Sequence, residues 1–124
     1  MVLPGTMGSV LQQRGETVWL DYWRLLRGQL KRLRMGQPDV EPVDLIGDFY
    51  GPMVEFLARS HRVEIFPYDW RQSVTVAAAR LAESLAQWLP EMEASGQPVH
   101  LVAHSMGGLV VRAMIADGGA GTAV

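Results

Sequence analysis

The segment best suited to chemistry is AHSMGG, from Ala103 to Gly108, in which Ser105 lies between an apolar run and a helical pattern. A serine at a sharp turn from a strand into a helix exposes its hydroxyl group and can attack a carbonyl carbon. Ala103 and Gly107 are small, which lets strand and helix approach each other, and the helix N-terminus favours developing negative charge. The pattern therefore predicts a nucleophile; the alternative is an ordinary turn in which Ser105 only caps the helix.

Acyl transfer through a serine also needs hydrogen-bond donors for the oxyanion of the tetrahedral intermediate, and fixed backbone N–H groups serve this purpose. Met106, the residue after the nucleophile, is one expected donor. The second is expected from the loop LPGTMGS near the N-terminus, with Thr6 as the first choice and Met7 as the second. Gly5 would let this backbone turn toward a ligand. In the absence of Ser105, the loop would be an ordinary glycine-rich turn.

The sequence does not supply an evident base for Ser105. His61 and His100 belong to expected strands, and His104 adjoins Ser105 in the turn, where its side chain is expected to point away and to shape the site. Hydrolases with such an elbow place an acid and then a histidine after the serine. Asp117 is the only carboxylate after Ser105 and would lie about 18 Å away along a helix. The nucleophile is thus expected without its acid and histidine.

The elements expected to position these residues alternate between strands and helices. Apolar runs predict strands at residues 1–3, 62–67 and 98–103. Helical spacing predicts helices at residues 18–33, 52–60, 73–89 and 107–116. Ser73 is expected to cap the third helix and Pro90 to end it, while 35–48 is expected to be a loop and 118–124 a flexible tail. The alternation predicts one α/β domain, residues 1–124, with three central parallel strands and helices on both faces.

The expected helix at 18–33 has an apolar and a basic side. Trp19 and Trp23 lie on the apolar side, and five of the eleven basic residues of the chain fall within 18–34. Such a helix either lies at a membrane surface or packs on the domain as a cap with a solvated basic face. Both interpretations remain open from the residues alone.

Composition excludes several classes of protein. The chain has 124 residues, a net charge of −2 and no cysteine, so neither a disulfide scaffold nor a thiolate zinc site is possible. The acidic balance argues against nucleic-acid binding, which depends on a basic face. No apolar run reaches the roughly 20 residues that span a bilayer. Because the first ten residues lack a basic segment, no signal peptide is predicted; the location stays open, with the cytoplasm as the default.

Three motifs in this order, LPGTMGS, PYDWR at residues 67–71 and AHSMGG, resemble the α/β-hydrolase family of lecithin:cholesterol acyltransferases and lysosomal phospholipases. The resemblance implies that Ser105 is the nucleophile, that Thr6 and Met106 form the oxyanion hole, and that no cofactor or metal is needed. Ala103 replaces the glycine common in this family. The lack of the lid disulfide found in eukaryotic members indicates a bacterial relative.

The resemblance also implies roles for two other segments. PYDWR would lie near the nucleophile at the carboxyl end of a strand, where Asp69 and Arg71, on one face of an extended segment, brace the pocket. The alternative is a solvated ion pair that contributes little. The tryptophan-containing helix would be a lid over a lipid pocket, with Trp19 and Trp23 contacting lipid.

The expected function is that of a serine esterase, lipase or acyltransferase acting on lipid acyl esters, with possible substrates at a membrane surface. The 124 residues are expected to be the N-terminal half of the enzyme and to show little turnover alone. Two alternatives are a non-catalytic protein that binds lipid surfaces through its tryptophan helix and an inactive truncated product. The sequence leaves the acyl chain and the headgroup undetermined.

Overall fold

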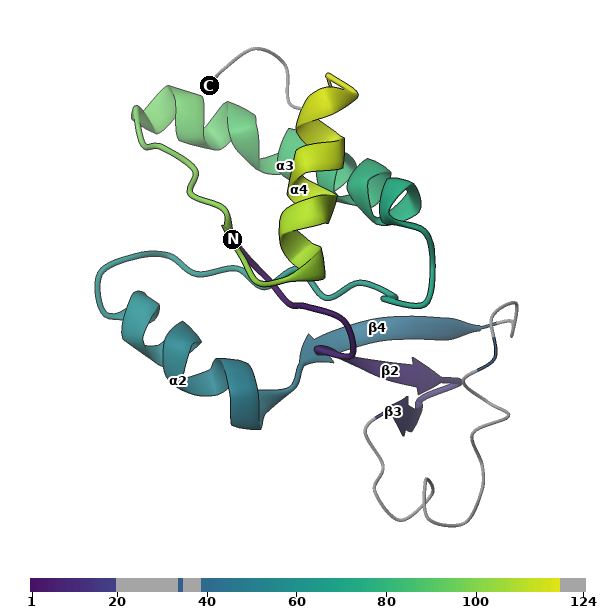
Figure 1. Ribbon diagram of the computed structural model, residues 1–124. Coiled ribbons are helices and arrows are strands. Elements are labelled where there is room, and N and C mark those ends of the chain that lie inside the picture. The colour runs from purple at the N-terminus through teal and green to yellow at the C-terminus, as the bar shows by residue number, and fades with distance from the viewer. Residues whose placement is uncertain (20–33, 35–38, 119–124) are drawn as a thin grey trace.

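The computed structural model describes residues 1–19, 34 and 39–118 (Figure 1). Its strands are β1 (Val2–Leu3), β2 (Ser9–Gln13), β3 (Glu16–Trp19), β4 (Val40–Leu45) and β5 (Val102–Ala103). Its helices are α2 (Gly47–Ala58), α3 (Val74–Ser95) and α4 (Met106–Ala116). The structure is therefore of the mixed α/β type.

The parallel sheet consists of two short strands. Val2 of β1 pairs with Val102 of β5, and Leu3 pairs with Ala103. On its other edge, β1 forms one isolated parallel bridge, between Val2 and Ile65. The strands expected at 62–67 and 98–103 are therefore reduced to a bridge and to two residues, respectively. Two strands and a bridge occupy the place of the three expected strands.

The two residues of β1 serve two separate cores, because successive side chains of a strand point to opposite faces. Leu3 packs in a core built mainly by α3 and α4, which includes Leu81 and Val110. Val2 packs in a second core with Leu45 and Tyr50, the latter on α2. Figure 1 shows α3 and α4 on one side of this N-terminal segment and α2 on the other. Helices on both faces were expected.

An antiparallel sheet in the order β3-β2-β4 was not predicted. The loop expected at 35–48 contains β4, and the helix expected from Val18 is wrong at its start, because Val18 and Trp19 belong to β3. Its remaining residues, 20–33, lie outside the described residues, as does the expected tail from residue 119. The sequence signal that was overlooked is Gly15. Arg14 and Gly15 form the turn between β2 and β3, and both have a positive φ (52° and 79°), which is typical of a two-residue β-hairpin turn.

The helices differ from expectation mainly at prolines. Ser73 caps α3 as predicted, accepting a hydrogen bond from the Val76 N–H at 3.4 Å, and Gly96 ends it with φ 65°. Pro90 does not end α3, and Pro52 lies well inside α2 rather than in its first turn. A proline inside a helix has no N–H to donate to the carbonyl of the residue four positions earlier. These residues are Asp48 for Pro52 and Ala86 for Pro90, and both are exposed, so water can bind their carbonyl groups.

The buried face of α2 also differs from the predicted one. Phe49 and Phe56, assigned to the apolar face by their spacing, are 76% and 64% exposed. Tyr50 is buried in their place. No helix of the described part of the chain combines the length and the apolar character needed to cross a membrane.

Candidate active site

Ser105 occupies the turn between β5 and α4 in a conformation that is costly for a serine. Its φ is 52° and its ψ −118°, which places it among the few described non-glycine residues with positive φ. Such backbone conformations cost about 1–3 kcal/mol and cluster at functional sites. The residue is exposed, and its hydroxyl group makes no capping hydrogen bond to α4. The structure therefore shows a strained turn rather than an ordinary N-cap.

Two glycines bring this turn against the N-terminal loop. A Cβ atom on Gly107 would lie 2.7 Å from the Pro4 carbonyl oxygen, closer than real Cβ contacts. One on Gly5 would lie 3.0 Å from Nδ1 of His104 and 3.1 Å from Cβ of Ser105. Ala103 is half-buried in β5. The small residues predicted to permit close approach thus lie at the contact between loop, strand and helix.

The two expected oxyanion donors are neighbours. The Thr6 hydroxyl lies 3.4 Å from the Met106 sulfur, although the residues are 100 positions apart in the chain. The Gly8 N–H donates to the Gly5 carbonyl at 3.0 Å and so closes a turn around Thr6. Within the described residues, neither the Thr6 nor the Met106 backbone N–H makes a hydrogen bond. Two unpaired donors therefore lie beside the exposed serine.

Tyr50 and His104 form a connection that sequence analysis missed. The Tyr50 hydroxyl accepts the Gly5 N–H at 2.8 Å and lies 3.0 Å from Nδ1 of His104. Because Gly5 donates to the phenol oxygen, the phenol proton is available to donate to Nδ1. No signal in the sequence marks Tyr50, since helical spacing selects Phe49 instead. His104 is thus connected to the loop through Tyr50.

The PYDWR segment contacts the same loop. The Tyr68 hydroxyl donates to the Pro4 carbonyl at 2.9 Å, and the Tyr68 N–H donates to the Ser9 hydroxyl at 3.0 Å. Burial, with a smaller contribution from Tyr50, raises the pKa of Tyr68 to about 12. Tyr68 therefore remains a neutral hydrogen-bond donor at ordinary pH.

Asp69 and Arg71 form a buried ion pair, so the solvated alternative is wrong. Their side chains are only 3% and 6% exposed, and Arg71 contacts the two carboxylate oxygens through Nη2 at 2.6 Å and Nε at 2.8 Å. Burial raises the pKa of Asp69, but hydrogen bonds and the charge of Arg71, with a hydrogen bond from Gln72, outweigh it and leave the pKa lowered. The pair holds the turn that follows Tyr68.

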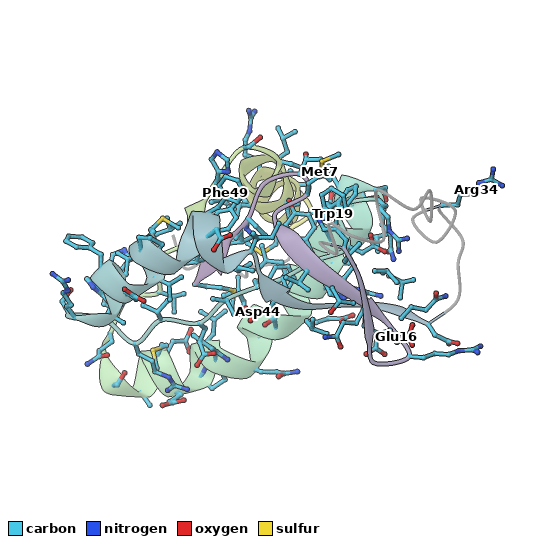
Figure 2. The ribbon with its side chains drawn as sticks, turned by 90° about the horizontal axis from the view of Figure 1, so that it is seen from below. Met7, Glu16, Trp19, Arg34, Asp44 and Phe49 are labelled. Atoms are coloured by element: carbon cyan, nitrogen blue, oxygen red, sulfur yellow. The ribbon has the colours of Figure 1, made fainter. Side chains whose placement is uncertain are left out.

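Trp19 also lies against this loop rather than on a lid helix. Its indole N–H donates to the Met7 carbonyl at 2.9 Å, and its ring meets that of Trp70 edge to face at 5.4 Å. Figure 2 shows Trp19 and Met7 beside each other, with Phe49 on the same side of the molecule. Trp23, the other expected lid residue, lies outside the described residues.

A cavity of about 650 Å³ lies elsewhere, at the amino ends of β1 and β5. Its lining includes Met1, His61, Trp88 and His100, but not Thr6, Ser105 or Met106. The rings of His61 and His100 contact each other there, with centroids 6.1 Å apart. Among the described residues, no three side chains of the metal-binding types gather in a group that could hold an ion.

Comparison with known proteins gives one match. Residues 50–118, more than half of the chain, match the model of the lecithin:cholesterol acyltransferase family. The matched range includes Tyr50, the PYDWR segment and Ser105. No curated protein and no solved structure matches the chain.

Proposed function

The chain belongs to the lecithin:cholesterol acyltransferase family, and from this premise we propose that Ser105 is the nucleophile of an acyl-transfer reaction on lipid esters. In the proposed reaction, the Ser105 hydroxyl oxygen attacks the ester carbonyl carbon and the alcohol leaves, so that the acyl group becomes bound to the serine. Water or another alcohol then accepts the acyl group. The oxyanion of each tetrahedral intermediate binds to the Thr6 and Met106 N–H groups.

The observation that carries this proposal is the strained, exposed Ser105 beside two backbone donors without partners. Catalysis by an oxyanion hole requires donors fixed before charge develops. Strain at a non-glycine residue persists only where the surrounding structure holds it. Here the contacts at Gly5 and Gly107 hold the turn in place.

The proposed reaction also needs a base, which the described residues do not provide. His104 is engaged with Tyr50 through Nδ1, while His61 and His100 line the cavity at the opposite ends of the strands. Asp69, the buried carboxylate of PYDWR, is bonded to Arg71 and does not meet any of these histidines in an ion pair. We therefore expect the 124 residues alone to react slowly, at the residual rate that binding and an oxyanion hole support.

An alkyl fluorophosphonate tests the nucleophile without requiring turnover. The serine oxygen would bond to phosphorus, fluoride would leave, the hydroxyl proton would pass to solvent, and intact mass would show one adduct. Because no base activates Ser105, we expect slow formation of the adduct on the unmodified chain and on Ser95→Ala, a control at the far end of α3, and none on Ser105→Ala. Equal labelling of Ser105→Ala, or no adduct on the unmodified chain after prolonged exposure to excess reagent, would overturn the proposal.

Exposed apolar side chains support a lipid as the substrate. Met7, on the loop beside Ser105, is 49% exposed, and Phe49, at the start of α2, is 76% exposed. Exposed large apolar groups near a site fit contact with an acyl chain. We propose that they contact the chain of the bound ester.

A comparison of chain lengths tests this contact. On the unmodified chain, a dodecyl fluorophosphonate should label Ser105 faster than its ethyl counterpart. Met7→Ser and Phe49→Ser should reduce this preference, whereas Ile115→Ser, at a position on α4 that is about as exposed as Met7, should retain it. A preference unchanged in both site variants would contradict the assignment.

A further inference from the structure

One peptide group of the N-terminal loop is bonded at both of its polar atoms by tyrosine hydroxyls. The carbonyl oxygen of Pro4 accepts from Tyr68 at 2.9 Å. The N–H of Gly5, which belongs to the same peptide group, donates to Tyr50 at 2.8 Å. Both tyrosines are buried, at 1% exposure for Tyr68 and 8% for Tyr50; Tyr50 lies in α2 and Tyr68 in the irregular segment before α3. Neither hydroxyl belongs to the motif that identifies the nucleophile.

Bonds at both ends of a peptide group fix more than its position. The group is a rigid plane, so the two hydroxyls together fix its rotation about the chain direction. The backbone leaves this plane at Gly5 and continues to Thr6, whose N–H is a proposed oxyanion donor. The Gly5 carbonyl in turn accepts from Gly8 at 3.0 Å, which closes the turn. The Thr6 N–H belongs to the same peptide group as this Gly5 carbonyl, so its direction is set by the clamped Pro4–Gly5 plane together with the turn that Gly8 closes.

The same tyrosine also connects the loop to the elbow. The Tyr50 oxygen lies 3.0 Å from Nδ1 of His104, the residue before Ser105. The His104 N–H donates to the Leu3 carbonyl at 3.1 Å, so this residue is held by the loop from two directions. The separation between the Thr6 donor and the serine is consequently tied to one phenol group.

We propose that Tyr50 and Tyr68 are positioning residues that clamp the Pro4–Gly5 peptide and thereby hold the Thr6 N–H toward the oxyanion formed at Ser105. The role toward the oxyanion rests on the proposed function, whereas the clamp itself consists of the two hydrogen bonds to the Pro4–Gly5 peptide and does not depend on it. Catalytic power of this kind comes from donors whose direction is fixed in advance. Loss of either hydroxyl frees the peptide to rotate.

Amide hydrogen exchange, resolved by residue in NMR spectra of the unmodified chain, tests the clamp without any substitution. The Gly5 and Gly8 amides should exchange at least tenfold more slowly than the Thr6 amide, relative to their intrinsic rates. Comparable exchange of Gly5 and Thr6 would overturn the clamp. This measurement decides the matter even if a tyrosine variant does not fold.

Tyr50→Phe and Tyr68→Phe then remove one hydroxyl each and keep the ring. We expect the Gly5 and Gly8 amides to exchange at least tenfold faster in either variant, with the Thr6 amide and the α3 and α4 amides unchanged. Ser95→Ala removes a hydroxyl that donates to the Met92 carbonyl at 2.9 Å, far from the loop, and is the matched control. Exchange in the loop equal to that of Ser95→Ala would refute the clamp.

The rate of Ser105 labelling by a fluorophosphonate tests the effect on chemistry. We expect each tyrosine variant to react at least tenfold more slowly than Ser95→Ala, and the double variant to react little more slowly than either, because the two hydroxyls act on one peptide. Unchanged labelling with a loosened loop would contradict the positioning role. If Ser105→Ala is labelled equally, the proposed nucleophile fails, and the exchange data still decide whether the clamp exists.

Discussion

The two ends of the parallel strands differ: the cavity lies at one end, and the strained serine turn lies at the other. The carboxyl ends carry Ser105 and the loop of Thr6, with two positive φ angles, three tightly enclosed glycines and two unpaired donors. The amino ends carry the cavity of about 650 Å³, lined by His61 and His100. Neither histidine has a positive φ, and no glycine lines that cavity.

The cavity therefore does not coincide with the end of the strands at which we propose the reaction. An enclosed space can result simply from a strand edge that meets the ends of helices. Strained backbone and unpaired donors are costly, and they persist only where the surrounding contacts enforce them. In an α/β sheet the carboxyl ends of the strands are also where ligands bind. If the two ends differ in this way, substitutions at the carboxyl ends should change stability and labelling more than substitutions at the amino ends.

The largest effect is expected from the ion pair at the carboxyl end. Arg71→Met should lower the free energy of unfolding by about 3–5 kcal/mol, because it leaves the buried Asp69 carboxylate without its partner. At the amino end, Glu91→Gln removes a pair with Arg62 whose side chains are 64% and 59% exposed, and should cost at most about 1 kcal/mol. Urea unfolding at pH 7 measures both. Equal losses would remove this energetic difference between the ends.

The same pair predicts the direction of a pH effect. Folding lowers the pKa of Asp69 below its unfolded value of about 3.9. The stability that this shift contributes is present above about pH 4 and is lost as the pH falls through the lower folded pKa. The free energies of unfolding of the unmodified chain and of Asp69→Asn should therefore converge as the pH is lowered from 6 to 2. Curves that stay parallel would contradict the assignment.

A smaller effect is expected at the contact between α4 and the loop. Gly107→Ala should destabilise the fold by about 2–3 kcal/mol, since its Cβ would lie 2.7 Å from the Pro4 carbonyl oxygen. Gly108→Ala is the matched control on the same helix: nothing lies within 4 Å of its Cβ, and alanine should stabilise the helix by about 0.5–1 kcal/mol. Denaturant midpoints should move in opposite directions. A loss of stability in both variants would indicate a general sensitivity of α4.

At the turn that holds Ser105, we expect a substitution that increases stability. Ser105→Gly relieves a positive φ that serine adopts poorly, so we expect about 1 kcal/mol of added stability together with loss of labelling. Ser95→Gly, near the end of α3, should instead lose about 0.5–1 kcal/mol. Thermal unfolding of the three chains distinguishes these signs. A destabilised Ser105→Gly would mean that the turn is not strained.

The smallest effect is expected at the cavity. His61→Ala and His100→Ala should change the rate of fluorophosphonate labelling by less than twofold, because both lie at the opposite ends of the strands from Ser105. The control is Tyr50→Phe, which is expected to slow labelling. A tenfold lower labelling rate in either histidine variant would mean that the amino end takes part in the reaction.

What could be predicted from the sequence was local. The turn at Ser105 and the cap at Ser73 depend on residues within a few positions of each other, whereas α3 was predicted to end at Pro90 and ends at Gly96. The proximity of Thr6 to Met106 was expected from the need of a serine nucleophile for two oxyanion donors, and the family resemblance implied the same pair. The roles proposed for these residues still await the labelling experiments.

The parts that were missed depend on tertiary contacts. The apolar spacing of α2 selects Phe49 and Phe56, yet the helix turns Tyr50 inward, where its hydroxyl meets Gly5 and His104. β4 was missed because its proline and its two acidic residues suggest a loop, although an edge strand tolerates Pro42. Periodicity reports which face is apolar, but not which polar atom finds a partner across the fold.

The separation of 100 positions between Thr6 and Met106 has a consequence for synthesis. At about 5–20 residues per second, the N-terminal loop waits about 5–20 seconds on the ribosome before its partner is made. Until β5 and α4 are made, Leu3 lacks the neighbouring strand and one of the two helices that cover it. Contacts between distant segments also form slowly, since chain closure costs entropy before they stabilise anything. The two halves of the proposed reaction centre thus meet at the end of folding, and a nascent chain depends until then on remaining soluble.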